Sequence, residues 1–162
     1  MADFERAIVK VLVREGGSRI SDDPTDNGGL TKFGISQASY PNVDIRNLTE
    51  SGAREIYKKD YWDKIKGDGI TSQLVAESIF DSCVNMGVRT FVRLTQNAMG
   101  VTNADGIVGN ATLSAINMAA EELVLLRLAL AKVIRYAEIC NRDRSQVKFM
   151  RGWINRIIEG LK

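Results

Sequence analysis

Apolar residues recur at intervals of three and four along most of this chain, and this spacing is the feature that most restricts its fold. In residues 3–15, for example, Phe4, Ile8 and Val11 fall on one face of a helix. Comparable segments cover about 49–62, 71–86, 88–99, 111–118, 121–140 and 146–159. Residues 16–36 carry a turn-rich pattern instead, and the sequence predicts a mainly α fold with at most a small β-hairpin.

Several residues mark where these helices begin and end. Asp3 and Thr49 are suited to cap helix N-termini, and Gly16 and Gly87 to end helices. The longest helix, about 121–140, is expected to bury one apolar side. That side consists of Leu123, Leu126, Leu130, Val133, Ile134 and Ala137.

Residues 16–36 are rich in turn-forming residues. Two Gly-Gly pairs bracket the sequence SDDPTD, and we expect at most a short hairpin here, in which LTKFGIS pairs as one small strand. Glycine leaves room for another molecule to approach the backbone. This segment is therefore a candidate wall of a binding cleft.

The composition excludes several classes of function. The chain has 162 residues, no histidine and a formal net charge of +2. Zinc hydrolases usually need imidazole ligands, and Ser-His and Cys-His catalysis needs an imidazole base. A charge this small does not favour nucleic-acid binding, although it would not repel an anionic polymer. We therefore expect chemistry carried by carboxylates, hydroxyls or amides, with no metal and no cofactor.

Cysteine use and hydropathy indicate a soluble protein. Cys83 and Cys140 both lie in apolar helical patterns, which favours two buried free thiols over a disulfide. The first residues, MADFERAIVKVLVREGG, lack the pattern of a secretory signal, and no stretch is long enough to span a membrane. We expect a monomer made in the bacterial cytoplasm without stable membrane insertion.

Glu15 is the strongest candidate for a catalytic residue. It shares a face with Phe4, Ile8 and Val11 and ends the first helix. Apolar surroundings and the negative end of the helix dipole both disfavour a charged carboxylate, so they would raise its pKa. A carboxyl protonated near neutral pH is the general acid that glycosidic cleavage requires. The alternative is a side chain that simply reaches solvent at a helix end.

The turn-rich segment offers partners for such an acid. Asp26 and Thr31 are candidates for a second catalytic or water-positioning group, and Asp22 is another acidic side chain nearby. The alternative for Asp22 and its neighbour Asp23 is capping of the turn before Pro24. Asp26 could equally form an Asx turn over Gly28.

Three further residues are candidates for substrate binding. Asp81 and Asn85 are four apart and share a helix face. They could bind sugar, or satisfy backbone groups in the interior. Tyr61 offers a flat surface for a sugar ring, but a Tyr-Trp pair at a helix end is also typical of a core.

Taken together, the segments EGG, DDPTDNGGLTKFGIS, YKKDYW and FDSCVNMG resemble the N-acetylmuramidases of phage and prophage endolysins, glycoside hydrolase family 108. Downstream, RLTQNAMG, DGIVGNATLSAI and GWINRI resemble the peptidoglycan-binding-like helical region of that family. The resemblance divides the chain into a catalytic part, 1–87, and a helical region, 88–162, packed on it as one body. Phe33 and Ser36 depart from the usual tyrosine and threonine.

The resemblance implies a lysozyme-like fold that hydrolyses the β-1,4 bond between N-acetylmuramic acid and N-acetylglucosamine, with Glu15 as the general acid. It also implies a role in host-cell lysis. Since no secretory signal is recognised, we expect that a holin-like membrane lesion would give the protein access to the wall. Two alternatives stay open. One is a lytic transglycosylase acting on the same bond, and the other is a peptidoglycan-binding protein without catalysis.

Overall fold

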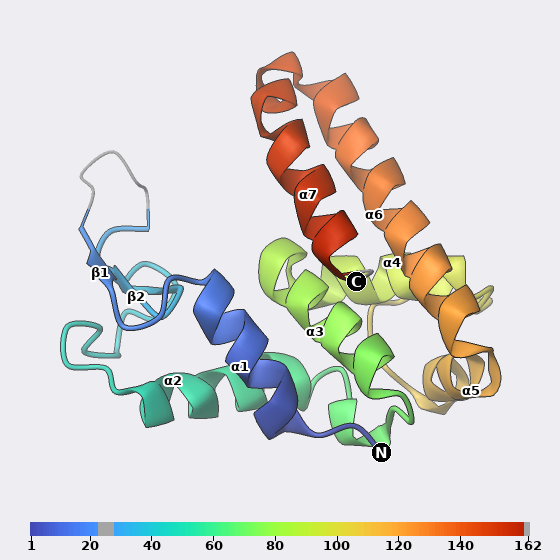
Figure 1. Ribbon diagram of the computed structural model, residues 1–162, viewed down its shortest axis with the longest axis horizontal. Helices are drawn as coiled ribbons and strands as arrows, with labels where there is room; N and C mark the ends of the chain where they lie inside the picture. Colours follow the sequence, from blue (N-terminus) through green and yellow to red (C-terminus); the bar gives the residue numbers. More distant parts are fainter. Residues whose placement is uncertain (23–27, 161–162) are drawn as a thin grey trace.

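The computed structural model describes residues 1–22 and 28–160 and is mainly α-helical (Figure 1). The α-helices are α1 (Phe4–Arg14), α2 (Glu50–Tyr57), α3 (Gln73–Met86), α4 (Val88–Ala98), α5 (Asn110–Met118), α6 (Glu121–Arg142) and α7 (Met150–Gly160). Shorter helical segments are η1 (Lys58–Trp62), η2 (Gly67–Gly69) and η3 (Arg144–Phe149). The helices α6 and α7 lie side by side and project away from the small sheet (Figure 1). The mainly α, lysozyme-like prediction is confirmed.

The ends of α1 follow from local chemistry. The Asp3 carboxylate accepts hydrogen bonds from the backbone amides of Glu5 and Arg6, as expected of an N-cap. At the other end, the Gly17 amide donates to the Leu12 carbonyl and the Gly16 amide to the Val13 carbonyl. This pair of bonds is a Schellman motif, and Gly16 takes the positive φ of 85° that it requires. Glu15 is therefore held at a defined C-terminal position.

The turn-rich segment contains three strands of two residues each. Strands β1 (Ile20–Ser21), β2 (Thr31–Lys32) and β3 (Ile35–Ser36) form an antiparallel sheet in the order β1-β2-β3. The segment LTKFGIS, predicted as one small strand, contains both β2 and β3, and β1 pairs with β2 on the other side. Phe33 and Gly34 make the tight turn with φ of 54° and 74°. The Phe33 ring is buried in the core, so this position presents no aromatic surface to a ligand.

The core is built around aromatic side chains from the first half of the chain. Trp62 packs edge-on against Phe4 and Phe80, with ring centroids 5.8 Å and 5.5 Å apart. The same apolar cluster includes Phe91 of α4 and Leu128 of α6. Residues 1–87 and the helices that follow them therefore share buried surface, because α3 contacts both α4 and α6.

The predicted buried side of α6 is wrong. Leu126 is 63% exposed and Leu130 is 58% exposed, and the rest of that predicted side is exposed as well. The residues that α6 buries are Val124, Leu128, Ala129, Ala131, Lys132, Tyr136 and Cys140. Apolar residues occupy more than one side of this helix, so spacing alone could not select the side facing α3 and α4.

A second, smaller cluster joins α6 to α7. The Tyr136 and Trp153 rings stack with centroids 4.7 Å apart, beside the buried Ile157. This packing directs the C-terminal half of α7 back toward α3. Cys83 and Cys140 are free and buried, as expected. Among the described residues, no helix is both long and apolar enough to cross a membrane.

Candidate active site

Glu15 opens onto a pocket at the end of α1. The pocket has a volume of about 460 Å³. Its lining residues are Glu15, Gly16, Arg19, Ile20, Ser21, Asp22, Thr31 and Gly34. The structure thus brings Glu15 and Thr31 into one site, although sixteen positions separate them. Asp22 adds a second carboxylate to the lining, and Arg19 adds a cation.

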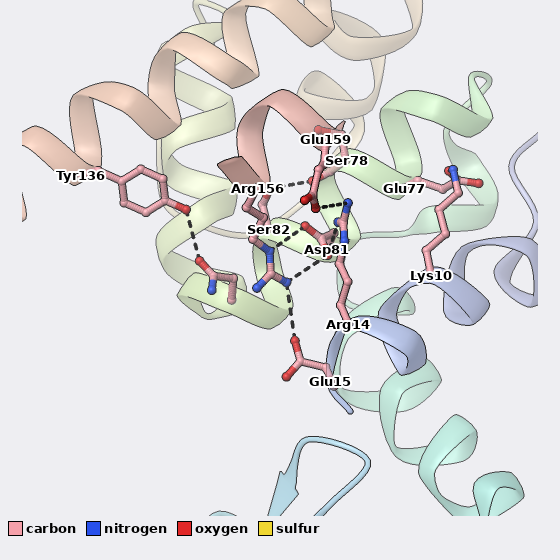
Figure 2. A network of polar contacts seen from close by, with 11 residues as sticks. Lys10, Arg14, Glu15, Glu77, Ser78, Asp81, Ser82, Tyr136, Arg156 and Glu159 are labelled. Carbon is pink, nitrogen blue, oxygen red and sulfur yellow. Dashed lines mark hydrogen bonds and ion pairs between the residues drawn. The ribbon is translucent and has the colours of Figure 1, made fainter. Parts of the chain in front are cut away.

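The Glu15 side chain lies between the sheet and the C-terminal helix. It is 24% exposed, and its Oε1 lies 3.5 Å from Arg156 Nη2 of α7. Figure 2 shows the Arg156 guanidinium between Asp81 and Glu15. Contrary to the expectation of apolar surroundings, the nearest charged partner of Glu15 is a guanidinium.

Gly34 allows the β2–β3 turn to approach Glu15 closely. A Cβ at Gly34 would lie 2.7 Å from Glu15 Cβ, 2.8 Å from the Tyr57 hydroxyl and 2.9 Å from Glu15 Oε2. Such distances do not occur without movement of the neighbouring atoms. The absence of a side chain at Gly34 is therefore what lets the turn, Glu15 and Tyr57 meet.

Tyr57 and Tyr61 are neighbouring phenols, of which Tyr57 approaches Gly34, and neither is among the residues that line the pocket. The Tyr57 hydroxyl donates to the Phe33 carbonyl at 2.8 Å, which ties α2 to the β2–β3 turn. Burial, together with the negative charge of Glu15, raises the pKa of Tyr57. Tyr61 is half-buried with its ring 5.5 Å from that of Tyr57. Burial also raises the pKa of Tyr61, so both phenols stay protonated and able to donate.

Asp81 anchors two arginines beside Glu15. Its Oδ1 accepts from Arg14 Nη1 at 2.8 Å and from Arg156 Nη2 at 3.0 Å, and its Oδ2 accepts from Arg156 Nε at 3.1 Å. Burial alone would raise the pKa of Asp81, but the hydrogen bonds and charges of Arg156 and Arg14 outweigh it and hold that pKa below its ordinary value. Asp81 is thus already engaged by two cations.

Of the other predicted site residues, Asn85 lies apart from the pocket, Asp26 lies outside the described residues, and Thr31 lines the pocket. Asn85 is exposed, and its Oδ1 accepts a hydrogen bond from the Tyr136 hydroxyl at 3.3 Å. Asp26 falls in 23–27, which the structure does not describe. Thr31 is half-buried in the pocket, where its Oγ1 donates to the Gly29 carbonyl at 3.0 Å.

Sequence reasoning did not identify Arg14, Gly34, Tyr57 or Arg156 as parts of this site. Arg156 lies 141 positions from Glu15, and no local pattern links the two. Arg14 directly precedes Glu15, but adjacent residues of a helix do not share a face, and the partners of Arg14 are Asp81 and Glu159, so this adjacency was no signal of the network. Within the described part of the chain, no cluster of three or more histidine, cysteine or acidic side chains could hold a metal ion.

Comparisons with known proteins agree with the two-part resemblance. Residues 8–87 match the family model of glycosyl hydrolase 108, and residues 87–158 match that of a predicted peptidoglycan domain. The solved structure of SagA from Brucella abortus has a TM-score of 0.81 and 28% sequence identity, covering 97% of this chain and 90% of that one. No curated protein matches the chain.

These matches fit the geometry of the site. The pocket at Glu15 lies within the first matched segment, and α4, α5, α6 and most of α7 lie within the second. A glycoside hydrolase joined to a peptidoglycan domain is a peptidoglycan-degrading enzyme. Residues 8–87 of this chain belong to the glycosyl hydrolase 108 family, and a predicted peptidoglycan domain follows them directly.

Proposed function

We propose that this enzyme hydrolyses the β-1,4 bond between N-acetylmuramic acid and N-acetylglucosamine, with Glu15 as the general acid. The observation that carries the proposal is the position of Glu15. Its carboxyl group lies at the fixed end of α1 and faces a pocket of about 460 Å³ that also holds Asp22 and Thr31. Glycoside hydrolases usually place a carboxylic acid on one side of the scissile bond and a second polar group, most often another carboxylate, on the other side.

In the proposed reaction, Glu15 donates its proton to the glycosidic oxygen as the bond from that oxygen to C1 of N-acetylmuramic acid breaks. The oxygen leaves as the 4-hydroxyl of N-acetylglucosamine. A water molecule adds to C1 and gives up a proton, so a reducing end forms. Asp22 and Thr31 are candidates to orient this water, since both line the pocket with Glu15. Asp26 remains a sequence-based candidate for the same role.

Tyr61, Asp81 and Asn85 are proposed to contribute to substrate binding in different degrees. Tyr61 is only half-buried and lies against Tyr57, close to the site. Asn85 is exposed and therefore accessible to a glycan. Asp81 is engaged by Arg14 and Arg156, so a direct contact with sugar would require those ion pairs to rearrange.

The test is digestion of purified peptidoglycan followed by mass analysis of the released fragments. Hydrolysis adds one water per bond and yields reducing N-acetylmuramic acid ends. Anhydro-muramic ends without reducing ends would instead identify a lytic transglycosylase. Reducing N-acetylglucosamine ends would show cleavage of the other glycosidic bond. Binding to sacculi with no released fragments would contradict catalysis altogether.

A further inference from the structure

Arg156 links the peptidoglycan domain to the candidate catalytic residue. It lies on α7, in the segment matched to the peptidoglycan domain, whereas Glu15 and Asp81 lie in the glycosyl hydrolase segment. Its side chain is only 23% exposed, and its Nη2 is shared between Asp81 Oδ1 at 3.0 Å and Glu15 Oε1 at 3.5 Å. One guanidinium thus contacts both carboxylates from across the domain boundary.

The two contacts of Arg156 differ in strength. The contact with Asp81 is a bidentate pair of normal hydrogen-bond length, which fixes the plane of the guanidinium. The contact with Glu15 is long for a hydrogen bond, so it acts mainly through charge and leaves the carboxyl group free to adjust. Asp81 therefore anchors Arg156, and Arg156 in turn faces Glu15.

The orientation of the Glu15 carboxyl group follows from these contacts. Oε1 faces Arg156, while Oε2 lies on the side of Gly34 and the Tyr57 hydroxyl. We propose that Arg156 is a positioning residue for Glu15, so that the peptidoglycan domain completes the catalytic site rather than only binding the wall. This inference rests on the proposed role of Glu15.

The charged and titratable groups around Arg156 come from four helices. Glu15 follows α1 and Arg14 ends it, Asp81 lies on α3, and Lys132 and Tyr136 lie on α6. Glu159 on α7 is 3.8 Å from Arg14. Lys132 is 8% exposed and makes no hydrogen bond or ion pair with any described residue. Changing either Arg156 or Asp81 therefore alters the net charge that Glu15 experiences.

The test compares Arg156→Gln and Asp81→Asn in the full-length enzyme. A general acid works only while protonated, so activity falls on the alkaline side of its pH profile. Removing the Arg156 cation favours the protonated form of Glu15 and moves that alkaline limb to higher pH. Removing the Asp81 charge leaves the nearby cations uncompensated. These cations favour the ionised form of Glu15, so the alkaline limb moves to lower pH. A purely structural role for Arg156 would not move the limb in opposite directions in the two variants.

Turnover and binding supply the second measurement. In Arg156→Gln, kcat on soluble peptidoglycan chains should fall about 10- to 100-fold, because the acid is misoriented, while KM and binding to sacculi stay within about twofold. Arg156→Lys retains the positive charge but cannot form the bidentate hydrogen bonds of a guanidinium. The alkaline limb of its pH profile should therefore match that of the parent, and its kcat should lie between those of the parent and Arg156→Gln. Arg151→Gln, an exposed arginine on the same helix, is the matched control and should behave as the parent.

Two results would overturn the inference. One is a kcat within about threefold of the parent in folded Arg156→Gln, a loss smaller than misorientation predicts. The other is a pH profile of activity whose alkaline limb does not move in Arg156→Gln or in Asp81→Asn. If Arg156→Gln does not fold, the pH profile of Asp81→Asn alone decides whether the inference holds. Different results would contradict the proposed function itself: an inactive parent enzyme or a fully active Glu15→Gln variant.

Discussion

Asp81 and Arg156 are joined by two hydrogen bonds of 3.0 Å and 3.1 Å although 75 positions separate them in the sequence. The pair connects α3 of the hydrolase segment to α7 of the peptidoglycan domain, beside Glu15. A paired and hydrogen-bonded carboxylate of this kind contributes to stability in a pH-dependent way. The predictions below test this network, the candidate acid and the packing that supports both.

Glu15→Gln should abolish cleavage and leave folding intact. Glutamine retains the size of the side chain but cannot donate a proton to the leaving oxygen, and general acid catalysis is typically worth about 10²- to 10⁴-fold. The measurement is the initial rate of reducing-end release, with melting temperature and sacculus binding measured in parallel. Glu55→Gln, an exposed glutamate on α2, is the control and should keep full activity.

Substitutions of Thr31 and Asp26 should reduce the rate less than Glu15→Gln does, if those residues only position water or substrate. The Glu15 assignment fails if Glu15→Gln keeps more than about a tenth of the parental rate, since that loss is well short of the catalytic range.

Gly34→Ala should lower both stability and activity. The residue has a φ of 74°, which costs an L-residue about 1–2 kcal/mol, and the new Cβ would overlap Glu15 and the Tyr57 hydroxyl. For a chain of this size, the backbone cost alone corresponds to a melting temperature about 2–8 °C lower. The exposed Gly152 on α7 has open space for a Cβ, so Gly152→Ala should not lower the melting temperature. An equally active and stable Gly34→Ala variant would contradict the close approach at this turn.

Asp81→Asn should cost stability at neutral pH and little at strongly acidic pH. The folded-state pKa of Asp81 is held below its ordinary value of 3.8, so its ionised form stabilises the native state. That contribution is complete above the unfolded-state value and is lost as the pH falls through the lowered native value. Thermal unfolding of the parent and the variant at about pH 6 and about pH 3 should show a difference that narrows on acidification. A difference independent of pH would mean that the charge of Asp81 is not what stabilises the fold.

A fragment ending at Asn85 should be insoluble or unfolded. It would lack Phe91 and Leu128, which belong to the same buried cluster as Phe4 and Phe80. Exposing that apolar surface removes favourable burial and promotes aggregation. Soluble expression and a cooperative melting transition are the measurements. A soluble, active 1–85 fragment would show instead that the hydrolase segment is an independent module, and it would also contradict a catalytic need for Arg156.

The local structure could be predicted from the sequence. Helix spacing, the Asp3 and Thr49 caps and the glycine at position 16 were enough to predict the mainly α class, because each depends on residues within one or two turns. The same local logic predicted a short hairpin within residues 16–36 and the position of Glu15 at a helix end.

The sides on which the helices meet and the charges around Glu15 depend on how the whole chain packs. The apolar residues of α6 lie on several sides, and the side it buries is set by α3 and α4 rather than by its own spacing. Arg156 reaches Glu15 because the stacking of Tyr136 on Trp153 and the burial of Ile157 return α7 to α3. Contacts across 141 positions depend on the packing of the whole chain, and a local pattern carries no information about them.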